Sequence, residues 1–339
     1  MLQRRSTRTR LAVLAVCGSL SLAVTACGDD GGTSGSSGSG DVAAVIKGLD
    51  NPFFQQMEAG IDAADDNVDV QAAADITDTT GQLDKLTVVA GRDPACVIVN
   101  PIDGTNLVQG MAQLAANDVP IVNIDSPVDT DAAAQADAAP ATYIGTDNVD
   151  AGRLAGEQML SLLPDGGSVA LIGGIAGDVT SNARLDGFTE TAGSGVDIVQ
   201  TVAANWSRDE ALTQATTLLR ANDDLAGFFV ANDDMALGVA RAVSDVGRTG
   251  EVEIISVDGV LDGLKGVQSG DLSAVVAQYP YAIGEMGVHA CQAAIAGADL
   301  PSDVTAPIAL VTADNVDQAI EAAPAPFEAY DDPFAALVD

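Results

Sequence analysis

Basic and aromatic side chains are scarce in this chain. Only 14 of its 339 residues are Lys or Arg, against 49 Asp or Glu, so the formal net charge is −35. Aromatic residues make up 4% of the chain. A surface this acidic repels phosphate backbones, which excludes nucleic acid as a partner. The 47% of apolar residues is ample for cores of Ala, Val, Leu and Ile, and the length of the chain predicts two domains.

Histidine occurs once, which limits the catalytic chemistry open to the chain. A nucleophilic hydroxyl needs a neighbouring base, and nothing in the sequence brings His289 beside Ser181 or Ser207. The glycine pairs 166–167 and 173–174 lack the lysine of a phosphate-binding loop and the spacing of a dinucleotide fingerprint. No run of alternating aspartates closed by Gly and Glu marks a calcium loop. We therefore predict a protein that is not an enzyme and holds no cofactor or metal, with a structural role for His289.

Long apolar runs are missing after the first 26 residues. Residues 1–26 place several arginines before an apolar segment, which is the pattern of an export signal and is too short for a membrane span. The segment ends Val-Thr-Ala-Cys27, which resembles the lipobox of bacterial lipoproteins and implies that Cys27 carries a lipid; plain secretion is the alternative. Residues 28–40 are only Gly, Ser, Thr and Asp, so 27–40 is expected to be a lipidated cysteine on a flexible tether. The lipid would be the only membrane contact, at the outer face of the cell membrane.

From residue 41 onward, short apolar runs alternate with helical patterns, which is typical of parallel sheets with crossover helices. Strands are expected to end near Lys47, Asn100, Asp125, Gly145, Gly173, Asn232, Asp258 and Gln278. Helices are expected to begin near Asn51, Thr105, Asn148, Asn182, Ser207, Asp233 and Tyr281, and residues 131–140 are expected to be a loop.

Polar residues follow many of these strands. Asn232 is the clearest case, because the apolar run 228–231 leads directly through it into a helical pattern. Ligands of open α/β sheets lie outside the carboxyl ends of the strands, so the repetition predicts one pocket built from many loops. For Asn232 alone, capping of the following helix is the alternative role.

Six short motifs follow one another along the chain. They are Lys47-Gly-Leu-Asp-Asn-Pro-Phe-Phe54, Ile175-Ala-Gly177, Asn182-Ala-Arg-Leu-Asp-Gly-Phe188, Ala231-Asn-Asp-Asp-Met-Ala-Leu-Gly238, Val257-Asp-Gly259 and Val276-Ala-Gln278. In this order, over residues 41–312, the chain resembles the ribose-, allose- and galactose-type solute-binding proteins of ABC sugar importers. The resemblance implies an α/β fold of two similar lobes, each a parallel sheet flanked by helices, joined by a three-strand hinge and closing on a sugar.

The same resemblance sets the expected domain limits. The N-terminal lobe would comprise residues 41–144 plus 279–307, and the C-terminal lobe residues 145–278 plus 308–321. Residues 322–339 contain three prolines and several acids, and we interpret them as a surface extension.

Ligand contacts are carried over from the family by position. Hydrogen-bonding roles fall on Lys47, Asn51, Asp125, Arg184, Asn232, Asp258 and Gln278, and ring-stacking roles on Phe54 and Trp206, with Phe53 as a secondary candidate. Lys47 stands where allose-type members carry Lys, and Ser126 stands where ribose-type members carry Arg. The resemblance therefore favours a hexose or a sugar alcohol over ribose.

The chemistry of these side chains also fits an uncharged carbohydrate. Sugar hydroxyls both donate and accept, so they suit carboxylates and amides beside cationic donors. Two cations, Lys47 and Arg184, balance two anions, Asp125 and Asp258, as a neutral ligand would favour. For Lys47, a solvated strand end paired with a surface acid is the alternative. The aromatic rings can cover the apolar C–H faces of a sugar.

The resemblance implies a monomer that delivers a neutral sugar or polyol to ABC permease subunits in the membrane. A sensor lipoprotein that presents its ligand to a membrane receptor is the alternative, because its pocket would look the same. Bacterial repressors use this fold as an effector domain, but they begin with a helix-turn-helix and not with an export signal.

Two of the four cysteines fall within the expected lobes. Cys96 begins an expected strand, and Cys291 lies in a helix expected over 283–296. Outside the cytoplasm they could form a disulfide, or they could be separate buried residues, and the sequence leaves both open.

Overall fold

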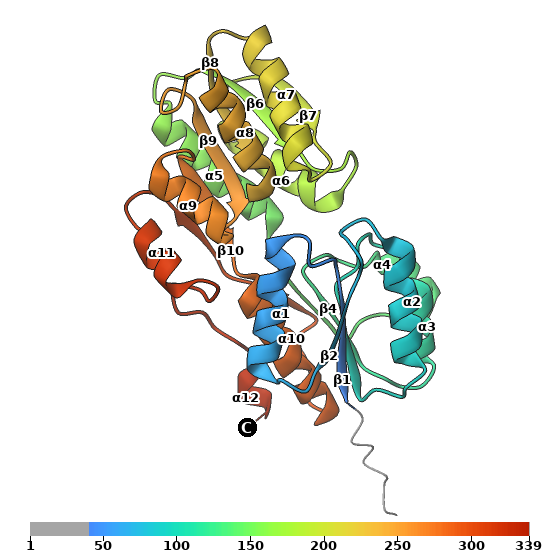
Figure 1. Cartoon of the computed structure of the whole chain (residues 1–339). Coiled ribbons are helices and arrows are strands. Elements are labelled where there is room, and N and C mark those ends of the chain that lie inside the picture. Colours follow the sequence, from blue (N-terminus) through green and yellow to red (C-terminus); the bar gives the residue numbers. More distant parts are fainter. Residues whose placement is uncertain (1–40, 339) are drawn as a thin grey trace, which may run out of the picture. The chain divides into compact units, whose positions relative to one another are not determined.

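Two six-stranded sheets organise residues 41–338, the part of the chain that this computed structural model describes. The expected export signal, Cys27 and the tether lie outside the described residues. The first sheet is entirely parallel and has the order β11-β5-β4-β3-β1-β2 (Figure 1). Its strands are β1 (Val42–Ile46), β2 (Asp69–Ala72), β3 (Cys96–Val99), β4 (Ile121–Ile124), β5 (Thr142–Gly145) and β11 (Asp303–Thr305).

The second sheet repeats this topology. Its order is β12-β10-β9-β8-β6-β7, and only β12 runs antiparallel to its neighbour. Its strands are β6 (Ser168–Gly173), β7 (Asp197–Ala203), β8 (Leu225–Val230), β9 (Glu253–Asp258), β10 (Ala274–Gln278) and β12 (Ile308–Val311). The expected fold class, two similar α/β lobes, is confirmed.

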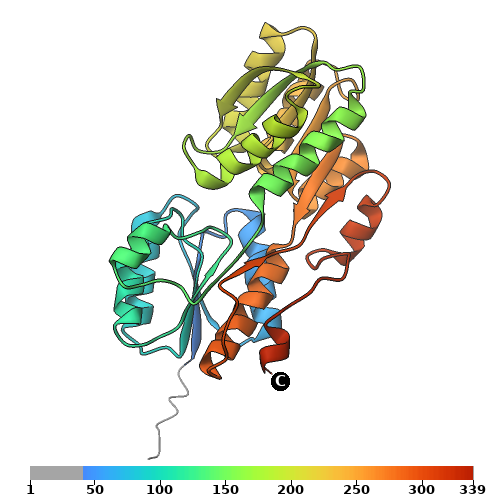
Figure 2. The same ribbon diagram turned by 180° about the vertical axis from the view of Figure 1, so that it is seen from behind.

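Helices cover both faces of each sheet (Figures 1 and 2). On the first sheet, α1 (Pro52–Ala64) and α10 (Pro280–Ile295) pack on one face, and α2 (Thr79–Ala90) and α3 (Val108–Ala115) on the other. On the second, α5 (Asn148–Leu162) and α6 (Val179–Ala192) pack on one face. The opposite face carries α7 (Arg208–Ala221), α8 (Asp233–Asp245) and α9 (Leu261–Ser269). Strands buried on both sides need apolar residues at every position, which is why they appear in the sequence as continuous apolar runs.

Up to α11 the chain passes between the lobes three times, at β5 to α5, at β10 to α10 and at β11 to β12. The α10 helix therefore packs on the first sheet although it follows the second in sequence. A disulfide between Cys96 of β3 and Cys291 of α10 joins the two, with Cα atoms 5.6 Å apart. Of the two alternatives that the sequence left open for these cysteines, the structure has the disulfide.

Residues 131–140 were expected to be a loop, and this is wrong for their first half. The α4 helix spans Thr130–Gln135. Its N-cap is Asp129, whose side chain accepts a hydrogen bond from the backbone N–H of Ala132 at 2.7 Å. A capping aspartate ahead of an alanine-rich segment favours a helical turn even without an apolar stripe.

The four edge strands, β2, β7, β11 and β12, were not among the expected strands. Apart from Val311, their residues are half-buried or exposed, so these strands lack the buried apolar run that marks the central strands.

The C-terminal segment is not the surface extension that its prolines and acids indicated. After α11 (Val316–Ala322) the chain returns to the first lobe, where Phe334 is fully buried and α12 (Ala335–Val338) packs on α10. The ring of Phe327 packs edge-on against Tyr279, with centroids 6.3 Å apart. Aromatic side chains, spaced a few residues apart, dock this segment despite its polar composition.

Two polar contacts hold the C-terminal segment on α10. The Nδ1 atom of His289 lies 2.6 Å from Oδ2 of Asp332, and the Tyr330 hydroxyl donates to Glu285. The hydrogen bond to Asp332 raises the pKa of His289. Burial acts to raise the pKa of Asp332, but the His289 contact and the backbone N–H of Phe334 bring it below its usual value. His289 thus has a structural contact.

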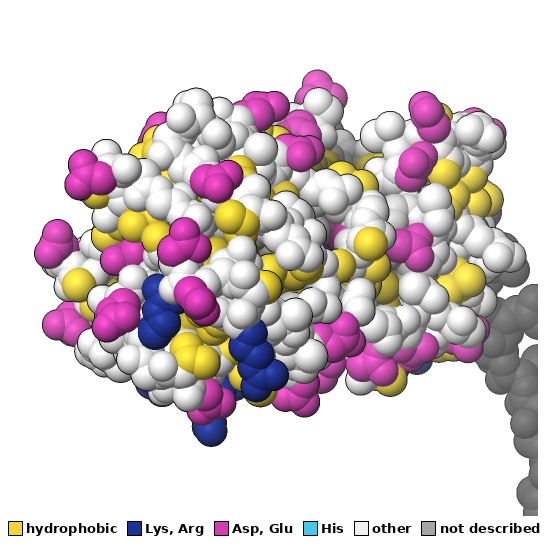
Figure 3. Space-filling view, turned by 90° about the horizontal axis from the view of Figure 1, so that it is seen from above, with side chains coloured by type: hydrophobic (Ala, Val, Ile, Leu, Met, Phe, Trp, Pro, Cys, Tyr) yellow, Lys and Arg dark blue, Asp and Glu magenta, His cyan; other side chains and the backbone are white. Residues whose placement is uncertain are grey.

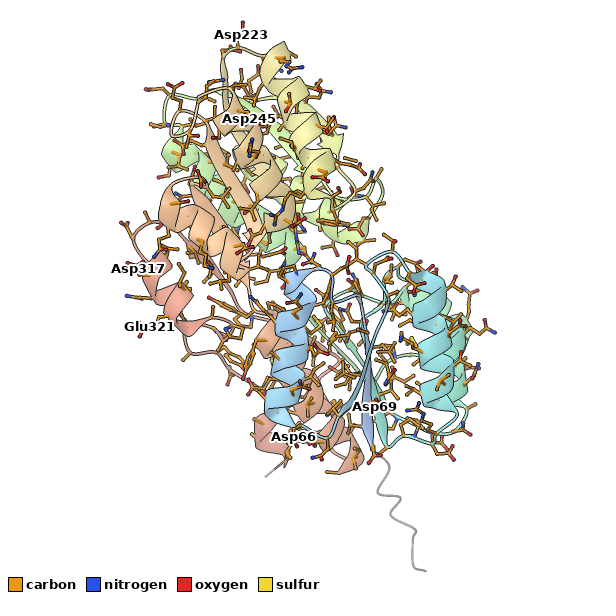
Figure 4. All side chains as sticks on the ribbon, in the orientation of Figure 1. Asp66, Asp69, Asp223, Asp245, Asp317 and Glu321 are labelled. Carbon is orange, nitrogen blue, oxygen red and sulfur yellow. A yellow bond between two sulfur atoms is a disulfide. The ribbon has the colours of Figure 1, made fainter. Side chains whose placement is uncertain are left out.

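Acidic side chains are spread over the surface. Figure 3 shows Asp and Glu scattered over the face in view, with Lys and Arg gathered in one small area of it. Side chains such as Asp223, Asp245 and Asp317 point outward from the second lobe (Figure 4). None of the helices within residues 41–338 combines the length and the apolar character that crossing a bilayer requires.

The contact between His289 and Asp332 predicts a pH-dependent contribution to stability. His289→Gln should lower the free energy of unfolding by about 1 kcal/mol at pH 6. Because the folded state holds the His289 proton more tightly, the contribution is fully present below the unfolded-state pKa of about 6.5 and is lost as pH rises through the raised folded-state pKa. The part contributed by Asp332 is present above 3.8 and is lost as pH falls. Denaturant unfolding at pH 6 and pH 9 measures this, and an equal loss at both values would contradict it.

Candidate functional site

A cavity of about 430 Å³ lies where loops of the two lobes face each other. Its volume is within the range of small-molecule sites. Ten of the eleven residues predicted to contact ligand line it, namely Lys47, Asn51, Phe53, Phe54, Asp125, Ser126, Arg184, Trp206, Asn232 and Asp258. Most follow the carboxyl ends of β1, β4, β7, β8 and β9, where the shared strand order of the two sheets brings them to one place.

The first-lobe side of the cavity carries a lysine held by its neighbours. The Nζ of Lys47 donates to Oγ of Ser126 at 2.6 Å and lies 3.9 Å from Oδ2 of Asp125. The Ser126 hydroxyl donates to the same Asp125 oxygen at 3.2 Å. Lys47 also lies 5.4 Å from the ring centroid of Phe54. Its side chain is 15% exposed, so it is not the solvated strand end that was the alternative.

On the second-lobe side, a buried arginine connects three elements. From α6, Arg184 donates through Nε to Oδ1 of Asn148 at 2.8 Å and through Nη1 to the carbonyl oxygen of Ala231 at 2.6 Å. The same Nη1 lies 3.5 Å from Oδ1 of Asp258. The guanidinium carbon is 5.9 Å from the ring centroid of Trp206. Two of its three nitrogens are thus bonded to the protein, and within the described residues Nη2 makes no hydrogen bond.

Gln278 is the one predicted contact that does not line the cavity. It is buried, and its Nε2 donates to Oδ1 of Asp258 at 2.8 Å. Its observed role is to hold Asp258 from behind, because the end of β10 lies beside the end of β9 in the sheet.

Asn51 and Asn232 cap helices and line the cavity at the same time. The Oδ1 of Asn51 accepts from the backbone N–H of Phe53 at 2.9 Å, and Oδ1 of Asn232 accepts from Met235 at 3.0 Å. The capping role considered for Asn232 is therefore present. It uses the side-chain oxygen only, and the amide NH₂ remains a donor for the cavity.

Three cavity residues have backbone conformations that are unusual for non-glycine residues. Their φ angles are 58° for Asp125, 60° for Trp206 and 139° for Asp258. Such conformations cost about 1–3 kcal/mol each and concentrate at functional sites. The Trp206 ring lies against Gly174, where a Cβ atom would be 2.2 Å from the ring. Only glycine permits that approach.

Asp258 in the cavity lining and Asp233 behind it are two buried carboxyl groups. Burial raises the pKa of Asp258 to about 7, although Arg184 and the Gln278 hydrogen bond act to lower it. Burial and the charge of Asp258 raise the pKa of Asp233. The predicted charge balance counted two cations and two anions and omitted Asp233. With all three aspartates ionised, the cluster would carry one excess negative charge. Asp233 follows Asn232 directly. Acids are so common in the first turn of helices that nothing in the sequence indicates its burial.

Sequence reasoning also missed aliphatic residues at the cavity. Ile76, Ile102 and Ile175 line it from three separate loops, together with Thr77 and Asp178. Only Ile175 belongs to one of the quoted motifs, and single aliphatic residues in loops have no periodicity that would mark them. Within residues 41–338 no three potential metal ligands cluster.

Comparison with known proteins finds a matching family profile and similar binding proteins. The sequence profile described as periplasmic binding protein domain matches residues 42–299. The chain is 33% identical over 255 residues to the D-allose-binding periplasmic protein of Escherichia coli (strain K12), covering 73% of this chain and 82% of that protein. It is 27% identical over 321 residues to the xylitol-binding protein of Mycolicibacterium smegmatis, covering 92% and 88%.

A solved structure has the same fold. An ABC transporter periplasmic solute binding protein from Actinobacillus succinogenes with bound D-allose superposes with a TM-score of 0.77 at 25% identity, over 82% of this chain and 99% of that one.

The approach of Gly174 to Trp206 predicts a spectroscopic effect. Trp206 is the only tryptophan of the chain, so tryptophan emission reports on this one ring. Gly174→Ala should displace the ring, shift the emission to the red and cost about 1–3 kcal/mol of unfolding free energy. Gly91→Ala is the matched control, because a Cβ atom there meets nothing closer than 3.6 Å. An unchanged emission spectrum in Gly174→Ala would show that the ring does not lie on this backbone.

Proposed function

This chain belongs to the periplasmic binding protein family of type I, a family of binding proteins and not of enzymes, and on that premise we propose that it binds a neutral monosaccharide or sugar alcohol and delivers it to an ABC permease. The relatives named above bind D-allose or xylitol. The observation that carries the proposal for this chain is one cavity flanked by Phe54 and Trp206 and lined by polar groups of both signs. Such a lining matches the hydroxyls and the C–H faces of a carbohydrate.

Each lobe contributes its own preassembled group. Lys47, Ser126 and Asp125 are bonded to one another within the first lobe, and Arg184, Asp258 and Gln278 within the second. Among the described residues no hydrogen bond between side chains joins these two groups across the cavity. A ligand that bonds to both would therefore favour their approach, since it gains contacts in the closed form that are absent in the open form.

Lys47 and Ser126 support a hexose or sugar alcohol over ribose. The Nζ of Lys47 reaches Ser126, so a single cation serves the position where ribose-type members of the family carry arginine. A lysine donates as a point charge and does not bridge two hydroxyls as a planar guanidinium does. We propose further that the protein acts as a monomer outside the cytoplasm and is held at the membrane by a lipid on Cys27.

Ligand class is tested by a thermal-shift panel that includes D-allose, D-ribose, xylitol and myo-inositol. At least one neutral compound should raise Tm in proportion to ln(1 + [L]/Kd), whereas sugar acids and sugar phosphates should not, because they would meet Asp125 and Asp258. Asp258→Ala should lower the affinity for the stabilising compound about 10- to 100-fold, since Arg184 and Gln278 then lose a buried partner. Asp262→Ala, which removes an exposed acid of α9, is the control. Stabilisation by the charged analogues alone would overturn the proposal.

The proposed anchor predicts a change of fractionation. Cys27→Ser expressed with its own leader should appear in the soluble extracytoplasmic fraction, and the unaltered protein in the membrane fraction, because a Ser cannot carry the thioether-linked lipid. Equal fractionation of the two would exclude lipidation at Cys27.

A further inference from the structure

Asp233 is fully buried, lines no part of the cavity, and has no place in the ligand contacts derived above. It is the first residue of α8, directly after Asn232. Its carboxylate accepts three hydrogen bonds, from Oγ of Ser256 at 2.5 Å and from the backbone N–H groups of Gly259 at 2.8 Å and Val260 at 2.9 Å. All three donors belong to β9 and the turn that follows it.

That turn is the one that carries Asp258. Asp258 has a φ of 139°, a conformation that a non-glycine residue keeps only when its surroundings impose it. Two of the three donors to Asp233 are the next two residues of the chain, so the carboxylate fixes the backbone immediately after Asp258. Gly263 in α9 leaves room for the Asp233 carboxylate, because a Cβ atom at this position would lie 2.1 Å from Oδ2 of Asp233.

The charged groups around Asp258 and Asp233 are unevenly distributed between the two residues. Asp258 faces Arg184 from α6, the Gln278 amide from β10, and the charge of Asp125 from the first lobe. On the helix of Asp233 itself, Asp234 is turned to Arg208, with Oδ1 2.7 Å from Nη2. Arg184 is therefore the cation that faces the two buried carboxyls, and its nearest approach is to Asp258.

We propose that Asp233 is a positioning residue of the binding site, whose buried carboxyl group holds the turn that presents Asp258. The proposal deepens the function above, because it rests on Asp258 as a ligand contact. Burial and the charge of Asp258 raise the pKa of Asp233, against the lowering effect of its three hydrogen bonds, and Arg184 lies beside Asp258, so the proton that the pair takes up first resides on Asp233.

A pH dependence follows from this arrangement. Burial raises the pKa of Asp258 to about 7, with a smaller contribution from the charge of Asp125, although Arg184 and the Gln278 hydrogen bond act to lower it. Above that value Asp258 is ionised and accepts strong hydrogen bonds from ligand hydroxyls, and below it the acceptor is lost. Ligand affinity should therefore fall as pH decreases through 7. Because Asp233 is the protonated member of the pair, its replacement by a neutral amide should leave this acid limb in place.

Asp233→Asn tests positioning without removing a charge from the pair. Its amide keeps one acceptor oxygen where the carboxyl group has two. In ¹³C NMR spectra of the ligand-free protein, with the Asp258 signal assigned by its loss in Asp258→Asn, the Asp258 chemical shift should move in Asp233→Asn while its titration midpoint stays near its original value. Asp234→Asn is the matched control, because it makes the same change at the adjacent, solvent-facing residue and should leave the chemical shift unchanged.

The second measurement is the affinity by calorimetry, at pH 8 and pH 5.5, for whichever of D-allose, xylitol and myo-inositol stabilises the unaltered protein most. Asp233→Asn should bind about tenfold more weakly at pH 8, because it loses one of the acceptor oxygens that hold the turn, and should cost no further affinity in a protein that already carries Asp258→Asn. Asp234→Asn should match the unaltered protein at both.

The outcomes distinguish the proposals. An Asp258 chemical shift that is the same in Asp233→Asn and in the unaltered protein overturns the inference, whatever the ligand. If none of the sugars binds, the proposed function fails while the NMR spectra still test Asp233. Should Asp233→Asn not fold, Ser256→Ala removes one donor to Asp233 and should move the Asp258 chemical shift, and an unchanged chemical shift there overturns the inference as well.

Discussion

Burial of the Asp258 carboxyl beside Arg184 is the constraint on which the second lobe's half of the site depends. A charged group removed from water is tolerated only with partners, and each partner comes from a different element: Arg184 from α6 and Gln278 from β10. Arg184 in turn needs Asn148 at the start of α5 and the carbonyl oxygen of Ala231 at the end of β8. The polar network therefore ties together the carboxyl ends of three strands and the first turn of a helix that begins at a lobe crossing. A cavity wall built in this way is rigid before any ligand arrives, which reduces the entropy lost on binding.

The first lobe reaches a comparable result with a smaller network. Lys47, Ser126 and Asp125 form one short chain of contacts at the ends of β1 and β4. Because both sheets have the same strand order, β4 in the first lobe corresponds to β9 in the second, and Asp125 and Asp258 end these corresponding strands. Both aspartates have positive φ angles. The acid at the end of the fourth strand is thus a repeated device, held by a lysine in one lobe and by an arginine in the other.

Much of this could be predicted from the sequence, and the exceptions have physical reasons. Asp258 and Asn232 were found because each closes a continuous apolar run, which a strand buried on both faces requires. The edge strand β7 was missed because its exposed positions carry no such signal. Asp233 was missed because a single sequence does not distinguish a buried first-turn acid from a solvated one. Phe334 was missed because acids and prolines surround a residue whose burial depends on a helix about 45 positions earlier, and long-range packing of this kind leaves no local pattern.

The crossings between the lobes also make the two ends of the chain interdependent. The first sheet is completed by β11, covered by α10 and joined to it through Cys96 and Cys291, yet β11 and α10 follow the whole of β6 to β10 in sequence. During synthesis, about the first 100 residues of the described part are therefore made before the last 60 or so, which complete and cover their sheet. A truncation late in the chain consequently damages the lobe that is made first and leaves the continuous α5 to β10 segment with most of its sheet.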